Sequence, residues 1–556
     1  MSQVGATFRE FPGAAPQPAA PSRVAHIISV SGAQAVAIVD RTSTAKDSRP
    51  RVEIGATMTI PTPHATVVGI VSAVSVPMPD AASGSEELAL IELNLAGEIM
   101  MDQRTLRLIF RRGVSSLPSI GDGVHLADRE SLTLAYAQPD VATIEVGALF
   151  QNPDVPARLL VDDLFGKHFL IVGTTGCGKS SALTCILQSL LHEYQQARVV
   201  ILDIHGEYAS AFGEQAEVIN PASLNLPFWL LNFQELTAAL TSADEYREAE
   251  MEILTDGVLW AKRRYSDAAN GRVRRSVDGL AVTVDTPLPF RLADLVAYID
   301  EQLGRLDRTL NTLALKRLKS RVETLVSDSR YSFMFGSLMI EDTMADVLGR
   351  LFRVPVAGKS ITVLDLSTVP AEIMDVVISV VSRLAFDLAS WSEARLPILI
   401  VCEEAHRYAP ADASGKFMPT RQALARIAKE GRKYGVSLAL ITQRPSELDG
   451  TILSQCSTAI AMRLSTERDQ SVIRANTHEG TLDLLDFLPL LGDREAIVLG
   501  QGSVMPMRIR FRELQGGRIS QHRHAAFSYG WKHTEITKDE LANIVRRWRT
   551  TSKPKL

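Results

Sequence analysis

A glycine-rich loop is the segment of this sequence whose residue types and spacing point most directly to chemistry. It reads Gly-Thr-Thr-Gly-Cys-Gly-Lys-Ser over residues 173–180, after the apolar run Phe169–Val172 and before the helix-compatible run Ala182–Leu191. Glycines let backbone N–H groups curl around phosphate oxygens where a Cβ would clash. Strand, loop and helix in this order predict a P-loop that binds a nucleoside triphosphate. The alternative is a chance match in a surface loop.

Two side chains of this loop are predicted to bind the phosphates and Mg²⁺. Lys179 can reach the β- and γ-phosphates, and the Ser180 hydroxyl can hold Mg²⁺. The predicted phosphate cradle consists of Gly173, Thr174, Thr175, Gly176, Cys177, Gly178, Lys179, Ser180 and Ser181.

Hydrolysis also needs an acid near Mg²⁺ and a group that orients the attacking water. The apolar run Pro397–Cys402 leads directly into Glu403 and Glu404. Ligands bind at the carboxyl ends of parallel strands, so both carboxylates are expected beside the P-loop. We expect Glu403 to approach Mg²⁺ through water and Glu404 to activate the attacking water. Most such strands carry Asp at the first acidic position, and the alternative is a pair of surface acids at a strand end.

Polar side chains follow two further apolar runs. Asp203 ends Val199–Asp203, which we expect beside the P-loop strand, and Gln443 follows Leu438–Thr442. Asp203 could order the Mg²⁺ shell or the water, or it could be a turn-forming residue. Gln443 could sense the γ-phosphate.

Phosphoryl transfer also places positive charge against the developing negative charge, and ring ATPases commonly supply an arginine from a neighbouring subunit. Arg426 and Arg432 lie on a predicted helix, Arg421–Tyr434, and are the candidates. For each of them, a surface or salt-bridge role is the alternative.

The pattern along the chain predicts an α/β fold: a P-loop core with a parallel-rich central sheet, a small N-terminal β-barrel and a helical insertion. Ala142–Val146 is expected as a barrel strand. Basic residues in the insertion indicate a solvated helix face or, alternatively, a nucleic-acid or partner surface. The expected domains are a disordered N-terminus over 1–22, a barrel over 23–150, a core over 151–236 and 354–514, the insertion over 237–353, and a tail over 515–556.

Composition excludes several classes of function. The net charge of −5 gives no overall basic signature, so any nucleic-acid contact must be local. No apolar stretch reaches membrane-spanning length and no signal peptide is recognisable, which argues against a membrane-bound coupling ATPase. Four cysteines are too few for a disulfide framework, which favours the cytoplasm. A kinase is disfavoured because the acidic strand lies far beyond the P-loop and no acceptor pocket is evident.

Taken together, the motifs resemble the HerA family of DNA-translocating ATPases, in the FtsK/HerA branch of RecA-like motors. Besides the P-loop, they are Asp-Ile-His-Gly-Glu-Tyr (203–208), Glu-Glu-Ala-His-Arg-Tyr (403–408), Lys-Glu-Gly-Arg-Lys-Tyr-Gly (429–435) and Thr-Gln-Arg-Pro-Ser (442–446), in this order. The resemblance covers most of residues 24 to 515, and it is strongest in the ATPase core.

The resemblance implies a homo-hexameric ring with ATP and Mg²⁺ at subunit interfaces and double-stranded DNA in the central pore. It implies an arginine from the next subunit, with Arg432 preferred and Arg426 second, because the family often has Arg where this chain has Lys429. One subunit would supply Lys179, Ser180, Asp203, Glu403, Glu404 and Gln443.

It further implies an effector partner, either a NurA-type nuclease or a Sir2-type or other effector, in DNA end processing or antiphage defence. The alternative function is a ring scaffold whose ATP binding assembles and activates an effector enzyme, with translocation secondary.

Overall fold

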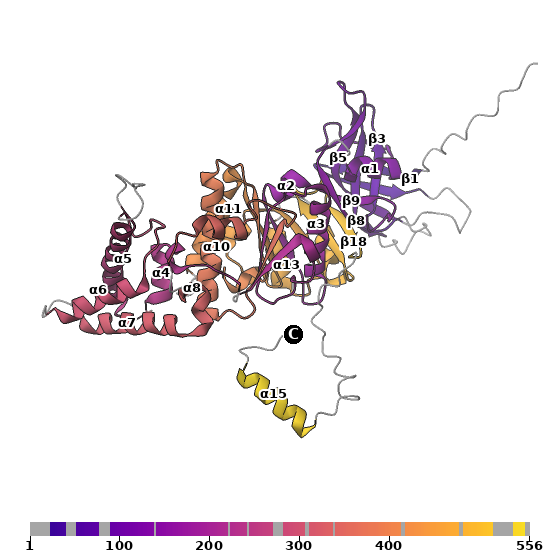
Figure 1. Cartoon of the computed structure of the whole chain (residues 1–556). Helices are drawn as coiled ribbons and strands as arrows, with labels where there is room; N and C mark the ends of the chain where they lie inside the picture. Colours follow the sequence, from indigo (N-terminus) through magenta and orange to yellow (C-terminus); the bar gives the residue numbers. More distant parts are fainter. Residues whose placement is uncertain are drawn as a thin grey trace, which may run out of the picture. The chain divides into compact units, whose positions relative to one another are not determined.

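The computed structural model describes residues 23–40, 52–76, 89–137, 141–220, 223–241, 244–270, 282–305, 311–336, 340–412, 418–476, 482–514 and 537–550. The chain divides into two compact units, Met1–Gln138 and Pro139–Leu556. The helix and strand labels used below are those of Figure 1. Within the described residues, no helix combines the length and the apolar character that crossing a membrane requires.

The first unit is a closed antiparallel β-barrel. Its sheet runs β2-β1-β7-β3-β4-β5, the pairing of β2 with β5 closes the ring, and β6 extends from β5. Alternate apolar side chains, such as Ala25 and Ile27 on β1, point into one buried core. The elements are β1 (Arg23–Ser31), β2 (Gln34–Val39), β3 (Thr57–Pro61), β4 (Thr66–Ser75), β5 (Leu90–Met101), β6 (Leu108–Arg112), β7 (Gly123–Leu126) and helix α1 (Arg129–Ala137).

One strand that we expected in the barrel belongs to the second unit. The segment expected at Ala142–Val146 forms β8 (Thr143–Leu149), which pairs with β18 (Met507–Phe511) and β9 (Pro156–Leu160). Gly147 permits the contact with β18, since a Cβ there would lie 2.1 Å from the Arg510 carbonyl oxygen. The expected barrel boundary at residue 150 is therefore too late, because the chain enters the second unit at Pro139.

The second unit is built on one large sheet that confirms the expected α/β class. Its order is β12-β13-β11-β14-β15-β10-β16-β17-β18-β8-β9, parallel from β12 to β16 and antiparallel beyond. The remaining strands are β10 (His168–Val172), β11 (Val199–Asp203), β12 (Ala216–Ile219), β13 (Ile361–Asp365), β14 (Ile398–Cys402), β15 (Val436–Thr442), β16 (Cys456–Ala461) and β17 (Glu495–Gly500). β10, β11, β14 and β15 are buried along their whole length, as parallel strands covered on both faces must be.

Helices flank this sheet, and those that lie between β12 and β13 in the sequence form a lobe of their own (Figure 1). In that lobe α5, α6 and α7 contact one another through residues such as Val258, Leu295 and Leu318. The helices are α2 (Val161–Phe165), α3 (Lys179–Glu193), α4 (Phe233–Leu240), α5 (Arg247–Asn270), α6 (Leu292–Gly304), α7 (Thr312–Ser327), α8 (Ser332–Phe335), α9 (Met344–Leu351), α10 (Ala371–Trp391), α11 (Met418–Tyr434), α12 (Gly450–Leu453), α13 (Glu467–Asn476) and α15 (Lys538–Thr550).

Several basic side chains of the lobe have acidic partners within it. Arg264 lies 3.4 Å from Asp294, and Lys319 lies 2.6 Å from Asp300. Lys262 is buried and donates to two backbone carbonyl oxygens. The ion pairs favour the solvated helix face over a nucleic-acid surface for Arg264 and Lys319, whereas the buried Lys262 belongs to neither. Arg272, Arg274 and Arg275 lie outside the described residues.

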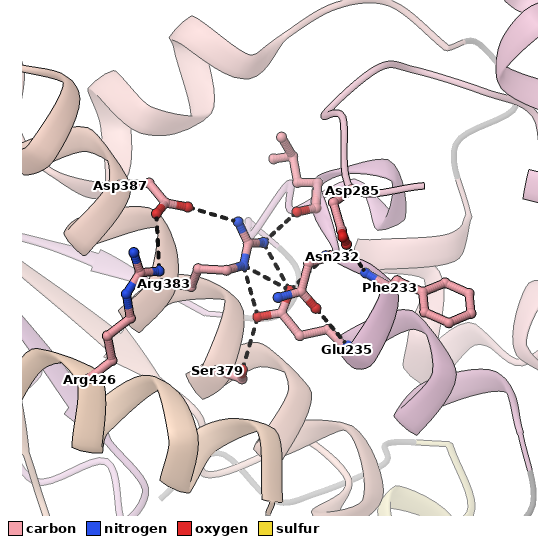
Figure 2. Close-up of polar contacts among 9 residues, drawn as sticks. Asn232, Phe233, Glu235, Asp285, Ser379, Arg383, Asp387 and Arg426 are labelled. Atoms are coloured by element: carbon pink, nitrogen blue, oxygen red, sulfur yellow. Dashed lines mark hydrogen bonds and ion pairs between the residues drawn. The ribbon is translucent and has the colours of Figure 1, made fainter. Parts of the chain in front are cut away.

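A buried ion-pair network joins this lobe to the core helices, as Figure 2 shows. Arg383 of α10 donates to Glu235 of α4 at 2.9 Å, to the Leu230 carbonyl oxygen at 2.6 Å and to Asp387 at 3.3 Å. Ser379 also donates to Glu235, which is 1% exposed. A buried carboxylate needs a paired cation or hydrogen bonds, and Glu235 has both, so Glu235 and Arg383 fix α4 against α10.

Within the part of the chain that the structure describes, no cation pairs with Asp375, one turn before Ser379 on α10. Burial, with a contribution from the Glu235 charge, raises its pKa to about 6. Because the folded-state pKa exceeds the unfolded one, ionisation destabilises the fold increasingly from about pH 4 to pH 6, by on the order of 3 kcal/mol. We predict that Asp375→Asn unfolds a few degrees above wild type at pH 7.5 and that the difference shrinks toward pH 4.5. Differential scanning fluorimetry across pH checks this, with exposed Asp346→Asn as control; a pH-independent difference would contradict it.

Candidate active site

The P-loop lies where the sequence places it, between β10 and α3. Gly176 and Gly178 have φ angles of 81° and 104°, which favour glycine. A Cβ on Gly173 would lie 2.5 Å from the Cys177 Sγ atom, so the loop cannot close around a larger residue there. Lys179 is 7% exposed, and its Nζ donates to the Thr174 carbonyl oxygen at 3.3 Å. The ammonium group is thus held over the loop, where a phosphate would be bound.

The neighbouring strands deliver the predicted polar residues to the same edge of the sheet. β15 is adjacent to β10 and ends just before Gln443, whose Oε1 accepts a hydrogen bond from the Thr175 hydroxyl of the P-loop. β14 comes next and ends before Glu403. Asp203 ends β11, which we expected beside β10; instead, β14 and β15 lie between the two strands. Strand order is set by long-range pairing, which a local pattern does not contain.

Asp203 builds a turn. It is fully buried, and its carboxylate accepts backbone N–H groups of all four residues from His205 to Tyr208, at 2.7–3.2 Å. Burial raises its pKa despite these hydrogen bonds. Both oxygens are committed to the backbone, so the structure favours the turn-forming role of Asp203 over the role in the Mg²⁺ shell that we also considered.

Glu403 is the buried carboxylate whose surroundings best fit a residue that helps to hold Mg²⁺. It is 2% exposed, and its Oε2 accepts a hydrogen bond from the Tyr208 hydroxyl at 2.6 Å. Burial raises the pKa of Glu403 to about 8, and the charges of Glu207 and Glu404 add to the rise while Lys179 opposes it. A nearby cation would restore the charged form, as expected of a side chain that helps to hold Mg²⁺.

Glu404 has an unusual backbone and an unusual carboxylate. Its φ of 48° is left-handed, a conformation that costs energy in a non-glycine residue and is frequent at active sites. The side chain is buried, and its Oε2 lies 3.3 Å from His406 Nδ1 but receives no hydrogen bond from any described residue. His406 Nδ1 instead pairs with the Thr442 hydroxyl at 2.9 Å. A buried oxygen of this kind can accept a proton from water.

One acid of the site was not selected from the sequence. Glu207 accepts a hydrogen bond from the Ser180 hydroxyl at 2.6 Å, so a third carboxylate reaches the P-loop. Its sequence signal is weak: it stands four residues after the strand-ending Asp203, and nothing local indicates the contact with Ser180.

The donor set fits Mg²⁺ bound together with a nucleotide. Ser180 and Glu403 offer oxygen atoms, the ligands that Mg²⁺ prefers. Among the residues that the structure describes, no three His, Cys, Asp or Glu side chains gather closely enough to hold a metal by themselves. Phosphate oxygens and water would therefore complete the coordination, as is usual for Mg²⁺ in phosphoryl-transfer sites.

The two candidate arginines differ in their surroundings. Arg426 stacks on Phe386, with its guanidinium 4.2 Å from the ring centroid. It also lies 3.9 Å from Asp387 (Figure 2). Arg432, near the end of the same helix α11, has an exposed side chain. Both side chains are exposed, and Arg426 in addition contacts Phe386 and Asp387 of its own chain.

The turn built by Asp203 gives a local prediction. Replacing Asp203 by Ala leaves four backbone N–H groups without their acceptor, so the amides of residues 205–208 should exchange with solvent at least about tenfold faster. Hydrogen exchange followed by mass spectrometry measures this directly. Asp365→Ala is the matched control, because Asp365 pairs with Asp203 in register but, among the described residues, its carboxylate accepts a single backbone N–H, that of Ser367. Unchanged exchange in Asp203→Ala would refute the assignment.

The chain is similar to several known proteins. The family described as helicase HerA, central domain (DUF87), matches residues 144–385. The chain is 25% identical to the DNA double-strand break repair helicase HerA of Pyrococcus furiosus over 71% of this chain and 74% of that protein. It is 28% identical to the probable helicase MJECL08 of Methanocaldococcus jannaschii over 72% and 75%.

Among solved structures, it is similar to VirB4 of Thermoanaerobacter pseudethanolicus, with 18% identity, a TM-score of 0.45 and coverage of 68% of this chain and 98% of that one. The resemblance first seen in the motifs is thereby confirmed in the sequence comparisons, with the P-loop, β11 and the start of α10 all inside the matched domain. Residues 144–385 of this chain thus match the HerA central domain, and the chain as a whole is similar to HerA helicases.

Proposed function

We propose that this chain is an ATP-hydrolysing motor that assembles as a hexamer and translocates on double-stranded DNA. The observation that carries the proposal is that three features meet at one edge of the sheet. They are the P-loop, the buried Glu404 whose Oε2 receives no hydrogen bond from the described residues, and Gln443, which is hydrogen-bonded to the P-loop. Relatives named as DNA double-strand break repair helicases supply the DNA substrate of the proposal. With a net charge of −5, DNA contact would be confined to a local surface such as a pore.

The proposed chemistry is hydrolysis of the bond between the β- and γ-phosphates of ATP, which releases ADP and phosphate. P-loop N–H groups and Lys179 hold the β- and γ-phosphates, and bound Mg²⁺, held by Ser180 and Glu403, would neutralise phosphate charge. Glu404 orients the attacking water and takes up its proton. Gln443 contacts Thr175 of the P-loop, so loss of the γ-phosphate can alter the loop after β15.

The proposed hexamer would let a neighbouring subunit supply a cation to this site. Phosphoryl transfer favours a cation on the transferring group besides the P-loop lysine, and Arg432 lies exposed on α11. We propose that Arg432 completes the site of the neighbouring subunit and that Arg426, held by Phe386 and Asp387, positions α11 instead. The proposed partner is a NurA-type nuclease or a Sir2-type or other effector, in cytoplasmic DNA end processing or antiphage defence.

The roles of Lys179 and Glu404 are separable. Lys179→Ala should weaken ATP binding by at least about tenfold, because the phosphates lose their charged partner. Glu404→Gln should bind ATP normally and hydrolyse it roughly 10²–10⁴-fold more slowly, because only water activation is removed. Fluorescent-nucleotide binding and phosphate release measure the two effects, with the exposed Glu393→Gln as control for Glu404→Gln. Equal loss of binding in both variants would argue against these roles.

The shared site makes a mixing experiment decisive. Arg432→Ala should bind ATP but hydrolyse it slowly, and Lys179→Ala should fail to bind. Mixed rings pair an intact P-loop from the first variant with an intact Arg432 from the second, so mixing should restore hydrolysis that neither variant has alone. Arg426→Ala in place of Arg432→Ala is the matched control. Absence of rescue in rings shown to be mixed would mean that Arg432 does not act across an interface.

Movement on DNA is tested by displacement of a triplex-forming oligonucleotide from linear double-stranded DNA. A translocating ring should strip the oligonucleotide in the presence of ATP, and the Glu404→Gln ring should not. If wild type hydrolyses ATP but leaves the triplex intact, the ring scaffold that switches an effector becomes the better account. A Glu404→Gln ring that still activates its effector would favour the scaffold as well.

A further inference from the structure

We infer that Glu207 is a positioning residue of the Mg²⁺ site: it orients the Ser180 hydroxyl so that the oxygen lone pairs of Ser180 face the cation. This inference rests on the proposed ATPase function, which it deepens. Its starting observation is the 2.6 Å hydrogen bond from Ser180 Oγ to Glu207 Oε2.

The argument begins with the geometry of a hydroxyl ligand. A serine hydroxyl has one hydrogen and two lone pairs, so an oxygen that faces a cation must direct its hydrogen elsewhere. In a buried or half-buried site that hydrogen needs an acceptor, and a carboxylate is the strongest one available. Glu207 supplies it, which fixes the rotamer of Ser180 and increases the electron density on its oxygen. Partners of this kind orient ligands and tune the affinity for metals.

Glu403, the other acid of the proposed metal site, has a different partner. Its Oε2 accepts the hydrogen bond from the Tyr208 hydroxyl. Glu207 thus accepts a hydrogen bond from Ser180, and the adjacent Tyr208 donates one to Glu403.

The turn explains why two adjacent side chains can act so specifically. Asp203 holds the backbone N–H groups of Glu207 and Tyr208 at 3.2 and 2.9 Å, so both side chains leave a fixed backbone. Because the Glu207 side chain takes no part in those turn hydrogen bonds, replacing its carboxylate by an amide should leave the turn intact. The effect of such a change should then appear in metal binding and not in folding.

The test measures metal binding rather than turnover. Mn²⁺ binding to the complex with ADP is followed by electron paramagnetic resonance, and ADP binding is measured with Mg²⁺ and in EDTA. We expect Glu207→Gln to bind ADP in EDTA as wild type does and to lose about 10–100-fold in Mn²⁺ affinity. Glu207→Asp, which keeps a carboxylate, should recover part of the loss. Glu214→Gln, an exposed change on the segment that follows, is the matched control and should match wild type.

A double-mutant cycle identifies the route of the effect. If Glu207 acts through Ser180, then Glu207→Gln should cost little in a Ser180→Ala background. An equal cost in both backgrounds would overturn the inference, since Glu207 would then act on the cation directly. Unchanged or increased Mn²⁺ affinity in Glu207→Gln would also overturn it, whereas the ATPase proposal would stand. Failure of wild type to bind ADP in either condition would instead remove the ATPase proposal, and the inference with it.

Discussion

The Asp203 carboxylate fixes the geometry on which the nucleotide site depends. Four consecutive backbone N–H groups converge on its two oxygens, and the residues they belong to lead to Glu207 and Tyr208. An isolated buried carboxylate is costly, and these hydrogen bonds offset that cost only when the turn is formed. The turn therefore sets the positions of Glu207, which accepts a hydrogen bond from Ser180, and of Tyr208, which donates one to Glu403. A residue that contacts no phosphate thus determines how two residues of the proposed metal site are presented.

The parallel sheet explains why so many functional side chains meet at one edge. β10, β15, β14 and β11 run in the same direction, so their carboxyl ends present the P-loop, Gln443, Glu403 and Asp203 in sequence across the sheet. Burial on both faces restricts those strands to apolar residues, and the first polar residue after each strand is therefore informative. This is why the P-loop, the acidic pair and the α/β class could be predicted from the sequence.

What could not be predicted depends on contacts between distant residues. The apolar alternation of Thr143–Leu149 identifies a strand. Its partner β18 is far away in the sequence, so the local pattern alone placed the strand in the barrel. The contact of Glu207 with Ser180 and the engagement of Arg426 by Phe386 and Asp387 likewise join separate elements. A local pattern could show that Asp203 ends a strand, but the two strands between it and β10 follow only from the complete sheet.

The central claim is that ATP hydrolysis at this site drives a ring on DNA. The most direct test is the ATP hydrolysis rate of the purified chain with and without linear double-stranded DNA, measured together with the native mass of the assembly. The account predicts a hexamer whose rate rises with DNA, falls with added salt and disappears in Glu404→Gln. A hexamer with a Glu404-dependent rate that ignores DNA would contradict the motor and favour an ATP-regulated scaffold.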